Sequence, residues 1–353
     1  MKLPDQCFRA VDMLRNCSRF LIVHHWDSDG IASAAMLGRF CLNSKSRVDY
    51  LVPKIGVYGI EALTLKDIPC SVDCIVVLDY SVDGRVFEKL KLDLERDIVV
   101  FDHHVVNPCS TCKAYCNPVA LGQGDEEVWP STTYLLYKFL SPSIDSEDLV
   151  VLGIVGDLTP YVDSKRGHRG LSYINDLLPK LRGLSLTKIR FAVDLVDSCY
   201  RVLNYDCIEY VRTRLIHEGL SDILNDPYLI KIKKEVDEVI SKALSSLRVL
   251  RTERELSVFH LKMDAFITSS IGRLLASNNP DRVITLVHEI PSLGGGFIYV
   301  RSVKYVLEDV LIKLKRAGLE VGGKKAVFVV RFKGDYSDVL NNVIDKLLNN
   351  LPH

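Results

Sequence analysis

Short apolar segments that are followed by acidic residues recur in the first half of this chain of 353 residues. Three of them, rich in Val and Ile, cover residues 20–23, 75–78 and 98–101. Such segments are typical of buried parallel strands. The carboxyl ends of parallel strands meet at one edge of an open sheet, where these folds bind ligands. The sequence therefore predicts an α/β fold with a ligand site at that edge.

Four acidic motifs are expected at strand ends, and the first three of them follow the three apolar segments. They are His25-Trp26-Asp27-Ser28-Asp29-Gly30, then Asp79, then Asp102-His103-His104, and last Gly153-Ile154-Val155-Gly156-Asp157. An isolated Asp after a strand is commonly a turn former or a helix N-cap, but the four motifs together favour a pair of metal ions. Carboxylates suit Mn²⁺ and Mg²⁺, and imidazole shifts the preference toward Mn²⁺. The motifs contain no cysteine, which argues against a structural zinc site. His24 is expected to be a buried core histidine.

In their order and spacing, these motifs resemble those of the DHH phosphoesterases, and among them the RecJ-like exonucleases and nanoRNases. The resemblance covers residues from about 20 to 160. It implies two metal sites that share Asp79 as a bridging ligand. His25 and Asp27 would complete the first site, and the second would be completed by Asp29, His103 and Asp157.

The same resemblance implies roles for the other two residues of the third motif. Asp102 would orient its neighbours without binding a metal ion itself. His104 would face the substrate phosphate and stabilise developing charge. Mn²⁺ is the expected cofactor, with two ions bound, and Mg²⁺ is the alternative.

The second half of the chain resembles, more weakly, the C-terminal DHH-associated domain of RecJ-like enzymes. Arg301 is the expected phosphate contact because a guanidinium can hold two oxygens at once; a solvated charge at a strand end is the alternative. The family's glycine-rich loop should end in histidine, but the aligned residues here are Gly322-Gly323-Lys324-Lys325. The two lysines could still bind phosphate as point charges beside glycine amides.

We expect two domains joined by a helical linker. Residues 1–190 would form the DHH phosphoesterase domain around a doubly wound parallel sheet, 191–226 the linker, and 227–353 a smaller α/β DHH-associated domain that binds substrate. Helices are expected at 31–40, 84–94 and 132–140, and another element at 147–154. Residues 107–130, rich in Pro, Gly and Cys, are expected to form a loop. Later in the chain the pattern changes to strand, helix, strand, strand over residues 256–261, 267–277, 283–288 and 296–301, with a last segment at 326–332.

Composition narrows the function classes. Lys and Arg number 45, as do Asp and Glu, so the formal net charge is zero and a strongly basic duplex binder is disfavoured. No apolar run reaches the roughly 18 residues that span a bilayer, and the N-terminus lacks the apolar segment of a secretory signal, so we expect a cytoplasmic protein. Few Gln and Met with many charged residues hint at a thermophilic source.

The ten cysteines include the spaced group Cys109-x-x-Cys112-x-x-x-Cys116, directly after the third motif. A zinc or iron–sulfur site would need a fourth ligand, and none is evident nearby. A loop disulfide or free thiols are therefore favoured. Disulfides inside cells are known mainly from hyperthermophiles.

Three functions fit the sequence. The leading one is a metal-dependent phosphodiesterase or exonuclease that acts on single-stranded DNA or RNA or on short oligonucleotides. The second is a phosphatase or phosphodiesterase of small nucleotides, such as cyclic dinucleotides or phosphoadenosine phosphate, which the zero net charge favours. The third, implied by archaeal RecJ relatives, is a replisome partner that binds the helicase or GINS with weak or no activity. The intact ligand set favours catalysis.

Overall fold

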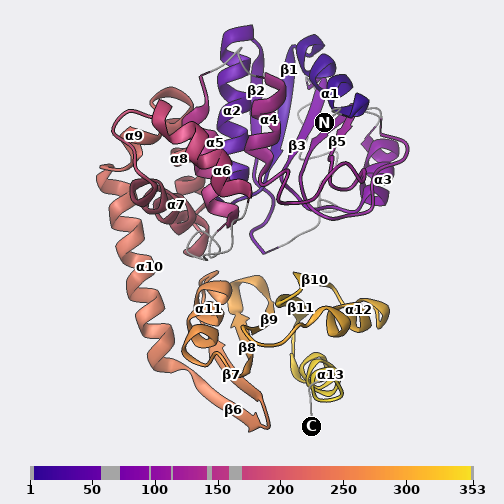
Figure 1. The fold of residues 1–353 in the computed structure, drawn as a ribbon, viewed down its shortest axis with the longest axis vertical. Helices are drawn as coiled ribbons and strands as arrows, with labels where there is room; N and C mark the ends of the chain where they lie inside the picture. Colours follow the sequence, from indigo (N-terminus) through magenta and orange to yellow (C-terminus); the bar gives the residue numbers. More distant parts are fainter. Residues whose placement is uncertain are drawn as a thin grey trace. The chain divides into compact units, whose positions relative to one another are not determined.

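The computed structural model describes residues 4–56, 72–94, 97–112, 114–140, 145–158 and 169–350. It contains two compact units, Met1–Tyr200 with Asn204–Lys233, and Arg201–Leu203 with Lys234–His353. The division between them falls inside helix α10 (Pro227–Ser246), which is drawn in orange in Figure 1. Among the described residues, no helix combines the length and the apolar character that a membrane crossing requires.

A five-stranded parallel sheet is the centre of the first unit. Its order is β2-β1-β3-β4-β5, with β1 at Arg19–His24, β2 at Arg47–Leu51, β3 at Cys74–Leu78, β4 at Asp97–Phe101 and β5 at Ala114–Cys116. Strand β3 is wholly buried, and β1 and β4 are buried after their first residue, which explains their Val and Ile content. The chain reverses its direction of travel across the sheet between β1 and β3. Open α/β sheets bind ligands at such a reversal.

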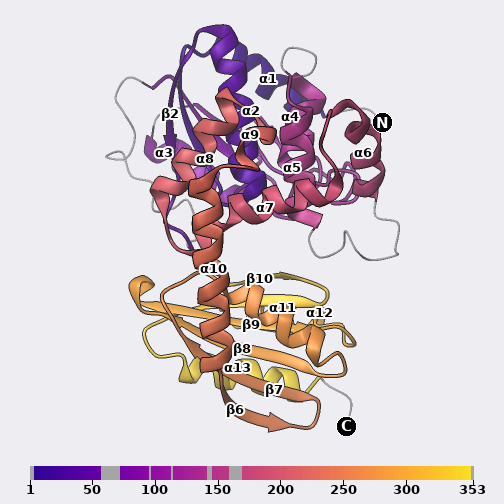
Figure 2. The ribbon, with the colours of Figure 1, turned by 90° about the vertical axis from the view of Figure 1, so that its left-hand side faces the viewer.

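Helices pack against this sheet and against one another. They are α1 (Asp5–Asn16), α2 (Ser28–Ser44), α3 (Gly84–Leu94), α4 (Thr132–Leu140), α5 (Glu147–Leu158), α6 (Arg169–Leu177), α7 (Leu186–Arg201), α8 (Tyr205–His217) and α9 (Leu220–Ile223), with a 3₁₀ turn at Leu178–Lys180. Helix α2 contacts α4, α5 and α8 and strands β1 to β3, and Figures 1 and 2 show it among them. Because it is enclosed on most sides, its run of small residues is buried.

Two expectations for the first unit were wrong. Strand β5 lies inside the predicted loop 107–130, and its three residues are too few to show strand periodicity. Asp157 lies in α5, so the fourth motif is not at a strand end. The expected helices at 31–40, 84–94 and 132–140 are confirmed as parts of α2, α3 and α4.

Eight described cysteines form disulfides, and Cys41 is a buried free thiol. Cys109 and Cys112 form a disulfide, which was one of the two alternatives favoured by the sequence, and both are buried. The remaining pairs are Cys7–Cys116, Cys17–Cys74 and Cys199–Cys207. Cys70 lies outside the described residues.

A six-stranded mixed sheet is the centre of the second unit. Its order is β10-β11-β9-β8-β7-β6, and β7 and β8 are its one parallel pair. The elements are β6 (Arg248–Glu253), β7 (Leu256–Lys262), α11 (Thr268–Asn278), β8 (Val283–Ile290), a 3₁₀ turn (Pro291–Leu293), β9 (Gly295–Ser302), α12 (Glu308–Arg316), β10 (Val321–Lys324), β11 (Val327–Lys333) and α13 (Ser337–Leu348). Helices α12 and α13 pack on one apolar face, whereas α11 and the end of α10 pack on the other. The five later patterns in the sequence are confirmed as β7, α11, β8, β9 and β11.

The predicted glycine loop of this unit is instead an edge strand. Gly322 and Gly323 lie in β10, and a short turn at Lys325 leads into β11. A Cβ on Gly323 would lie 2.3 Å from the carbonyl oxygen of Val327, so the close hairpin pairing itself requires glycine there. Gly323 therefore has a structural reason, whereas a Cβ on Gly322 would meet no atom within 4 Å.

Candidate metal centre

The backbone hydrogen-bond ladder of the parallel sheet continues one residue beyond three strand ends. The N–H groups of His25, Asp79 and Asp102 donate to the last carbonyls of β3, β4 and β5, over 3.2, 3.0 and 3.0 Å. These bonds keep the three residues in register along the carboxyl edge. The first two also lie on either side of the reversal between β1 and β3, where a ligand site is expected.

Three groups of side chains could each hold a metal ion, because within each group the ligand atoms lie within 4.8 Å of one another. Together the three groups contain every residue expected to bind metal. The groups are His25, Asp27 and Asp79; Asp29, His103 and Asp157; and Asp79, His103 and His104. Asp79 belongs to two of them, and its Oδ1 is 3.6 Å from Nε2 of His103. Asp79 therefore links the first motif to His103 and His104, whereas the group that contains Asp29 and Asp157 does not include it.

His103 and Asp157 face each other in a geometry that suits a cation between them. Nε2 of His103 and Oδ2 of Asp157 are 2.8 Å apart, yet neither atom has a hydrogen-bond partner among the described residues. The other ring nitrogen of His103, Nδ1, donates to the carbonyl of Trp129 over 3.1 Å. Since a carbonyl only accepts, Nε2 is left for a proton or a metal ion. The atoms present fit a divalent metal ion.

The pKa of His103 shows how strongly this position attracts a cation. Burial alone lowers the pKa of the imidazole, but the nearby carboxylates, Asp157 first and then Asp29 and Asp102, together raise it to about 9. A metal ion that binds here must displace that proton.

The N-terminus of α4 holds Asp29. The backbone N–H groups of Thr132 and Thr133 donate to its two oxygens over 2.6 and 3.1 Å, and the Thr132 hydroxyl donates to Asp79 over 3.1 Å. These dipoles favour a carboxylate. Even so, burial, followed by the charge of Asp157, raises the pKa of Asp29 to about 6.

Asp79 is more strongly perturbed than Asp29. Burial, followed by the charges of Asp29 and Asp27, raises its pKa well above the usual range. Its backbone is also left-handed, with φ of 60°, which Asp tolerates better than most residues and which is typical of functional sites. Without divalent cations these carboxylates repel one another.

The first motif forms a tight turn around His25 and Asp27. Nδ1 of His25 is 2.8 Å from Oδ2 of Asp27, and Asp27 also caps α2 by accepting from the N–H of Gly30 over 3.1 Å. Burial raises the pKa of Asp27, but the neighbouring His25 outweighs it and lowers the pKa to about 2. A Cβ on Gly30 would lie 2.5 Å from the carbonyl oxygen of His25, so this turn needs glycine.

Asp102 binds the two histidines that follow it. Its Oδ1 accepts from the N–H groups of His103 and His104 over 2.8 and 3.3 Å, and from Nδ1 of His104 over 2.8 Å. Asp102 is buried, whereas the His104 side chain is 28% exposed. His104 is therefore the member of this motif that a substrate can reach.

Glycines bring Asp157 to the site from its helix. A Cβ on Gly153 would lie 2.2 Å from Oδ1 of Asp29, and one on Gly156 would lie 2.1 Å from the Ser28 hydroxyl. Helix α5 can thus approach the start of α2 more closely than side chains would permit.

Sequence reasoning missed several supporting residues. The carbonyl of Trp129 and the first-turn amides of Thr132 and Thr133 are backbone groups and leave no motif. The fourth is Asp197 of α7, a buried carboxylate that accepts from the N–H of Ser28 over 3.0 Å. Its one signal is a charged residue within a buried stretch of α7.

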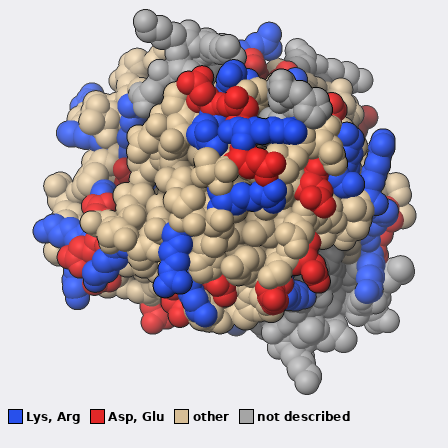
Figure 3. Space-filling view, turned by 90° about the horizontal axis from the view of Figure 1, so that it is seen from below, with Lys and Arg blue, Asp and Glu red and all other residues tan. Residues whose placement is uncertain are grey.

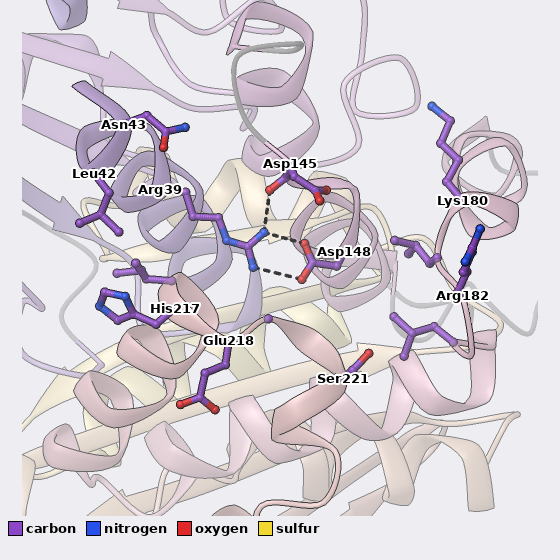
Figure 4. Close-up of a pocket in the computed structure, with 14 residues that line it drawn as sticks. Arg39, Leu42, Asn43, Asp145, Asp148, Lys180, Arg182, His217, Glu218 and Ser221 are labelled. Carbon is purple, nitrogen blue, oxygen red and sulfur yellow. Dashed lines mark hydrogen bonds and ion pairs between the residues drawn. The ribbon is translucent and has the colours of Figure 1, made fainter. Parts of the chain in front are cut away.

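A separate cavity of about 530 Å³ opens near the other end of α2. Figure 4 shows Arg39 at its centre, where its guanidinium donates to both oxygens of Asp148 and to the carbonyl of Asp145. None of the four acidic motifs contributes to its lining. This cavity is therefore not the metal centre.

Two of the substrate residues expected in the second unit, Arg301 and Lys324, share one row of its sheet. Arg301 of β9 is paired with Val327 of β11, and Val327 is paired with Lys324 of β10. Arg301 is partly buried and donates to the hydroxyl of Tyr299 over 3.3 Å, whereas Lys325 is exposed. On the face drawn in Figure 3, basic and acidic side chains are interspersed, with no continuous basic track.

Fold and site together define the class of this protein. Residues 19–154 match the DHH family, N-terminal domain. No curated protein matches the chain. A crystal structure of the exonuclease RecJ bound to manganese is similar over 100% of this chain and 96% of its own, with a TM-score of 0.64 and 15% identity. RecJ of Thermus thermophilus in complex with Mn²⁺ gives a TM-score of 0.67 at 16% identity over 100% of this chain and 56% of that one.

A third similar structure is the DHH domain of a protein described as a member of a family of ribosomal proteins, with a TM-score of 0.66 and 15% identity over 99% of this chain and 91% of that chain. Residues 19–154 thus match the N-terminal domain of the DHH family, and the chain has a RecJ-like fold. The family resemblance and fold class predicted from the motifs are confirmed.

Proposed function

We propose that this chain is a divalent-metal-dependent phosphoesterase that hydrolyses phosphodiester bonds at a two-metal centre. The observation that carries the proposal is the convergence of the ligand atoms of all four motifs, with Asp79 shared between two groups. The DHH-family match of residues 19–154 supports the same reaction class. Mn²⁺ suits the mixed carboxylate and imidazole donors, and similar RecJ structures are described with Mn²⁺ or Mg²⁺.

When bound, two divalent ions lower the pKa of a shared water and neutralise charge on a phosphoryl group. The protein's own residues position the ligands. Trp129 fixes the ring of His103, and the amides of α4 fix Asp29, so that little reorganisation is needed during the reaction. Asp102 accepts from Nδ1 of His104 and so fixes the orientation of the partly exposed ring that we assign to the substrate phosphate.

The leading substrate is single-stranded DNA or RNA, or a short oligonucleotide, cleaved from an end. Its support is the RecJ-like fold across both units of the chain. Arg301, with Gly322, Gly323, Lys324 and Lys325, is the proposed contact for phosphates away from the metal ions. The row that links Arg301 to Lys324 through one intervening strand supports this assignment.

A small nucleotide is the second candidate substrate. The zero net charge favours it, because a long polyanion is usually bound by a strongly basic surface. One protein of similar fold is a pGpG-specific phosphodiesterase, with a TM-score of 0.50 and 13% identity over 94% of this chain.

A substrate panel tests both the activity and the choice of substrate. Purified protein is incubated with Mn²⁺ and with labelled single-stranded DNA and RNA of graded length, a dinucleotide, and phosphoadenosine phosphate. Hydrolysis should require Mn²⁺ or Mg²⁺ and stop with chelator. Rates that rise with chain length support the nucleic-acid substrate, and rates highest for dinucleotides support the small-nucleotide alternative. Protein that binds Mn²⁺ but cleaves none of these substrates would contradict the proposal.

A further inference from the structure

A buried histidine–arginine pair lies directly behind the first acidic motif. His24 is the last residue of β1 and is fully buried, and Arg212 of α8 is only 5% exposed. Neither residue belongs to the groups of candidate metal ligands. The sequence predicted His24 as a core histidine, and its burial is confirmed, but burial does not explain the polar groups around it.

The partners of His24 define which ring nitrogen carries its hydrogen. Nε2 lies 3.4 Å from Nη1 of Arg212, and Nδ1 lies 2.7 Å from the carbonyl oxygen of His25. A guanidinium only donates hydrogen bonds and a carbonyl only accepts them. The neutral ring with its hydrogen on Nδ1 therefore satisfies both partners, whereas the opposite tautomer satisfies neither.

The hydrogen bond from His24 completes the backbone fixation of His25. The N–H of His25 already donates to the carbonyl of Leu78 at the end of β3 over 3.2 Å. With its carbonyl held by His24, both main-chain polar groups of His25 are fixed. The same carbonyl lies against Gly30, where a Cβ would be only 2.5 Å away. The direction of the His25 side chain toward Asp27 follows from this fixed backbone.

Arg212 occupies a costly place for a charged side chain. Its guanidinium lies over the ring of Tyr50, 3.9 Å from the centroid, and its Nη2 is 3.9 Å from the exposed Glu209. Its Nε has no hydrogen-bond partner among the described residues. Burial of an incompletely paired charge generally opposes stability. Arg212 therefore has a role other than stabilising the fold, and its contact with His24 indicates what that role is.

We propose that His24, oriented by Arg212, is a positioning residue for the metal ligand His25. Its Nδ1–H holds the His25 carbonyl, and thereby sets where the His25 imidazole stands relative to Asp27. The inference rests on the proposed function, which assigns His25 as a ligand. Residues behind the ligands of metal sites commonly contribute about 10–100-fold to metal affinity.

Two substitutions of His24 separate the role of its Nδ1–H donor from that of its Nε2 acceptor. The amide nitrogen of asparagine can take the place of Nδ1, so His24→Asn keeps the donor to His25. The longer glutamine places its amide near Nε2, so His24→Gln keeps a partner for Arg212 and loses that donor. Mn²⁺ titrations by calorimetry should show about 10-fold weaker binding for His24→Gln and a change within about 3-fold for His24→Asn. Arg214→Gln is the control, because it removes a charge from the same helix without touching His24.

Equal affinities in the two His24 variants, whether both normal or both weakened, would overturn the inference. If the variants fail to fold, the wild-type protein still provides a test. Its imidazole nitrogens can be read by long-range ¹H–¹⁵N NMR, and His24 should be the tautomer with hydrogen on Nδ1. Hydrogen on Nε2 would overturn the inference. A wild-type protein that binds no Mn²⁺ but shows the Nδ1–H tautomer would instead contradict the proposed function and leave the His24–His25 contact established.

Discussion

The two units hold their expected functional side chains in different ways. In the first, the acids and imidazoles are mostly buried, and they accept from or donate to backbone groups of neighbouring strands and helices. In the second, Arg301 donates to one tyrosine hydroxyl, and Lys325 lies exposed in a turn. The first site is held in place by backbone partners before it meets a ligand, whereas the second consists of side chains with few such partners.

Coordination chemistry explains this difference. A pair of divalent ions requires several carboxylates close together, and burying them raises their pKa values unless cations are bound. Fixed backbone partners limit that penalty and keep the ligands in place. Phosphate contacts remote from the bond that breaks need only charge and reach. Substitutions in the first unit should therefore act on metal binding and the rate of hydrolysis, and those in the second should act on KM.

The largest expected effect is that of Asp79→Asn. Asp79 is shared by two ligand groups, so its loss should reduce Mn²⁺-dependent hydrolysis by more than the roughly 100-fold that supporting residues contribute. The fold should persist, because the substitution preserves shape and also removes repulsion among buried carboxylates. Steady-state kinetics and calorimetric Mn²⁺ titration measure the two effects. Asp97→Asn, an exposed carboxylate at the opposite end of β4, is the matched control. Normal turnover by Asp79→Asn would remove the shared ligand from the mechanism.

The second prediction concerns stabilisation by metal. Mn²⁺ at about 100 times its Kd should stabilise the first unit by about 2.7 kcal/mol and leave the second unchanged. In scanning calorimetry, a transition assigned to the first unit should move upward by several degrees. If the transition assigned to the second unit moves equally, the metal site is not confined to the first unit.

This stabilisation should depend on pH. In the metal-free protein, burial and then Asp157 raise the pKa of Asp29 to about 6. A carboxyl whose folded pKa exceeds its unfolded value of about 3.9 stabilises the fold below that value, and this contribution is lost as the pH rises through about 6. Bound metal replaces the lost proton. The shift in Tm caused by Mn²⁺ should therefore grow between about pH 5 and about pH 7, and a shift that shrinks over this range would contradict the assignment of Asp29.

How much the sequence could predict also differs between the units. Strands β1, β3 and β4 were predictable because burial on both faces demands apolar runs, and the residues after them carry the ligands. Strand β5 was missed because three residues show no period. Asp197 and the α4 amides could not be found because long-range backbone contacts leave no local pattern. In the second unit, the sequence could not show that the glycines of β10 lie in a strand, since a close hairpin and a phosphate-binding loop both favour glycine.

The third prediction addresses the second unit. Arg301→Ala should raise KM by roughly 10- to 100-fold, since loss of a charged hydrogen bond costs about 1.5–3 kcal/mol and about 1.4 kcal/mol corresponds to one decade. Both kcat and Mn²⁺ affinity should stay near wild type. Arg316→Ala, an exposed charge on α12, serves as control. An unchanged KM would leave Arg301 as a solvated strand-end charge. A fall in kcat alone would contradict the assignment of the rate of hydrolysis to the first unit and of KM to the second.

The smallest effect is expected for Lys325→Ala. Lys325 is exposed in the turn between β10 and β11, so any contact with phosphate is screened by water and salt. Exposed ion pairs contribute about 0–1 kcal/mol, and KM should therefore rise no more than about 5-fold at low salt. In about 0.5 M KCl the difference from wild type should disappear, whereas the defect of Asp79→Asn should persist, because buried groups are screened much less. A Lys325→Ala defect that resists salt would mean that this turn is enclosed when substrate binds, and the contrast between a prepared metal site and a loosely held phosphate contact would no longer hold.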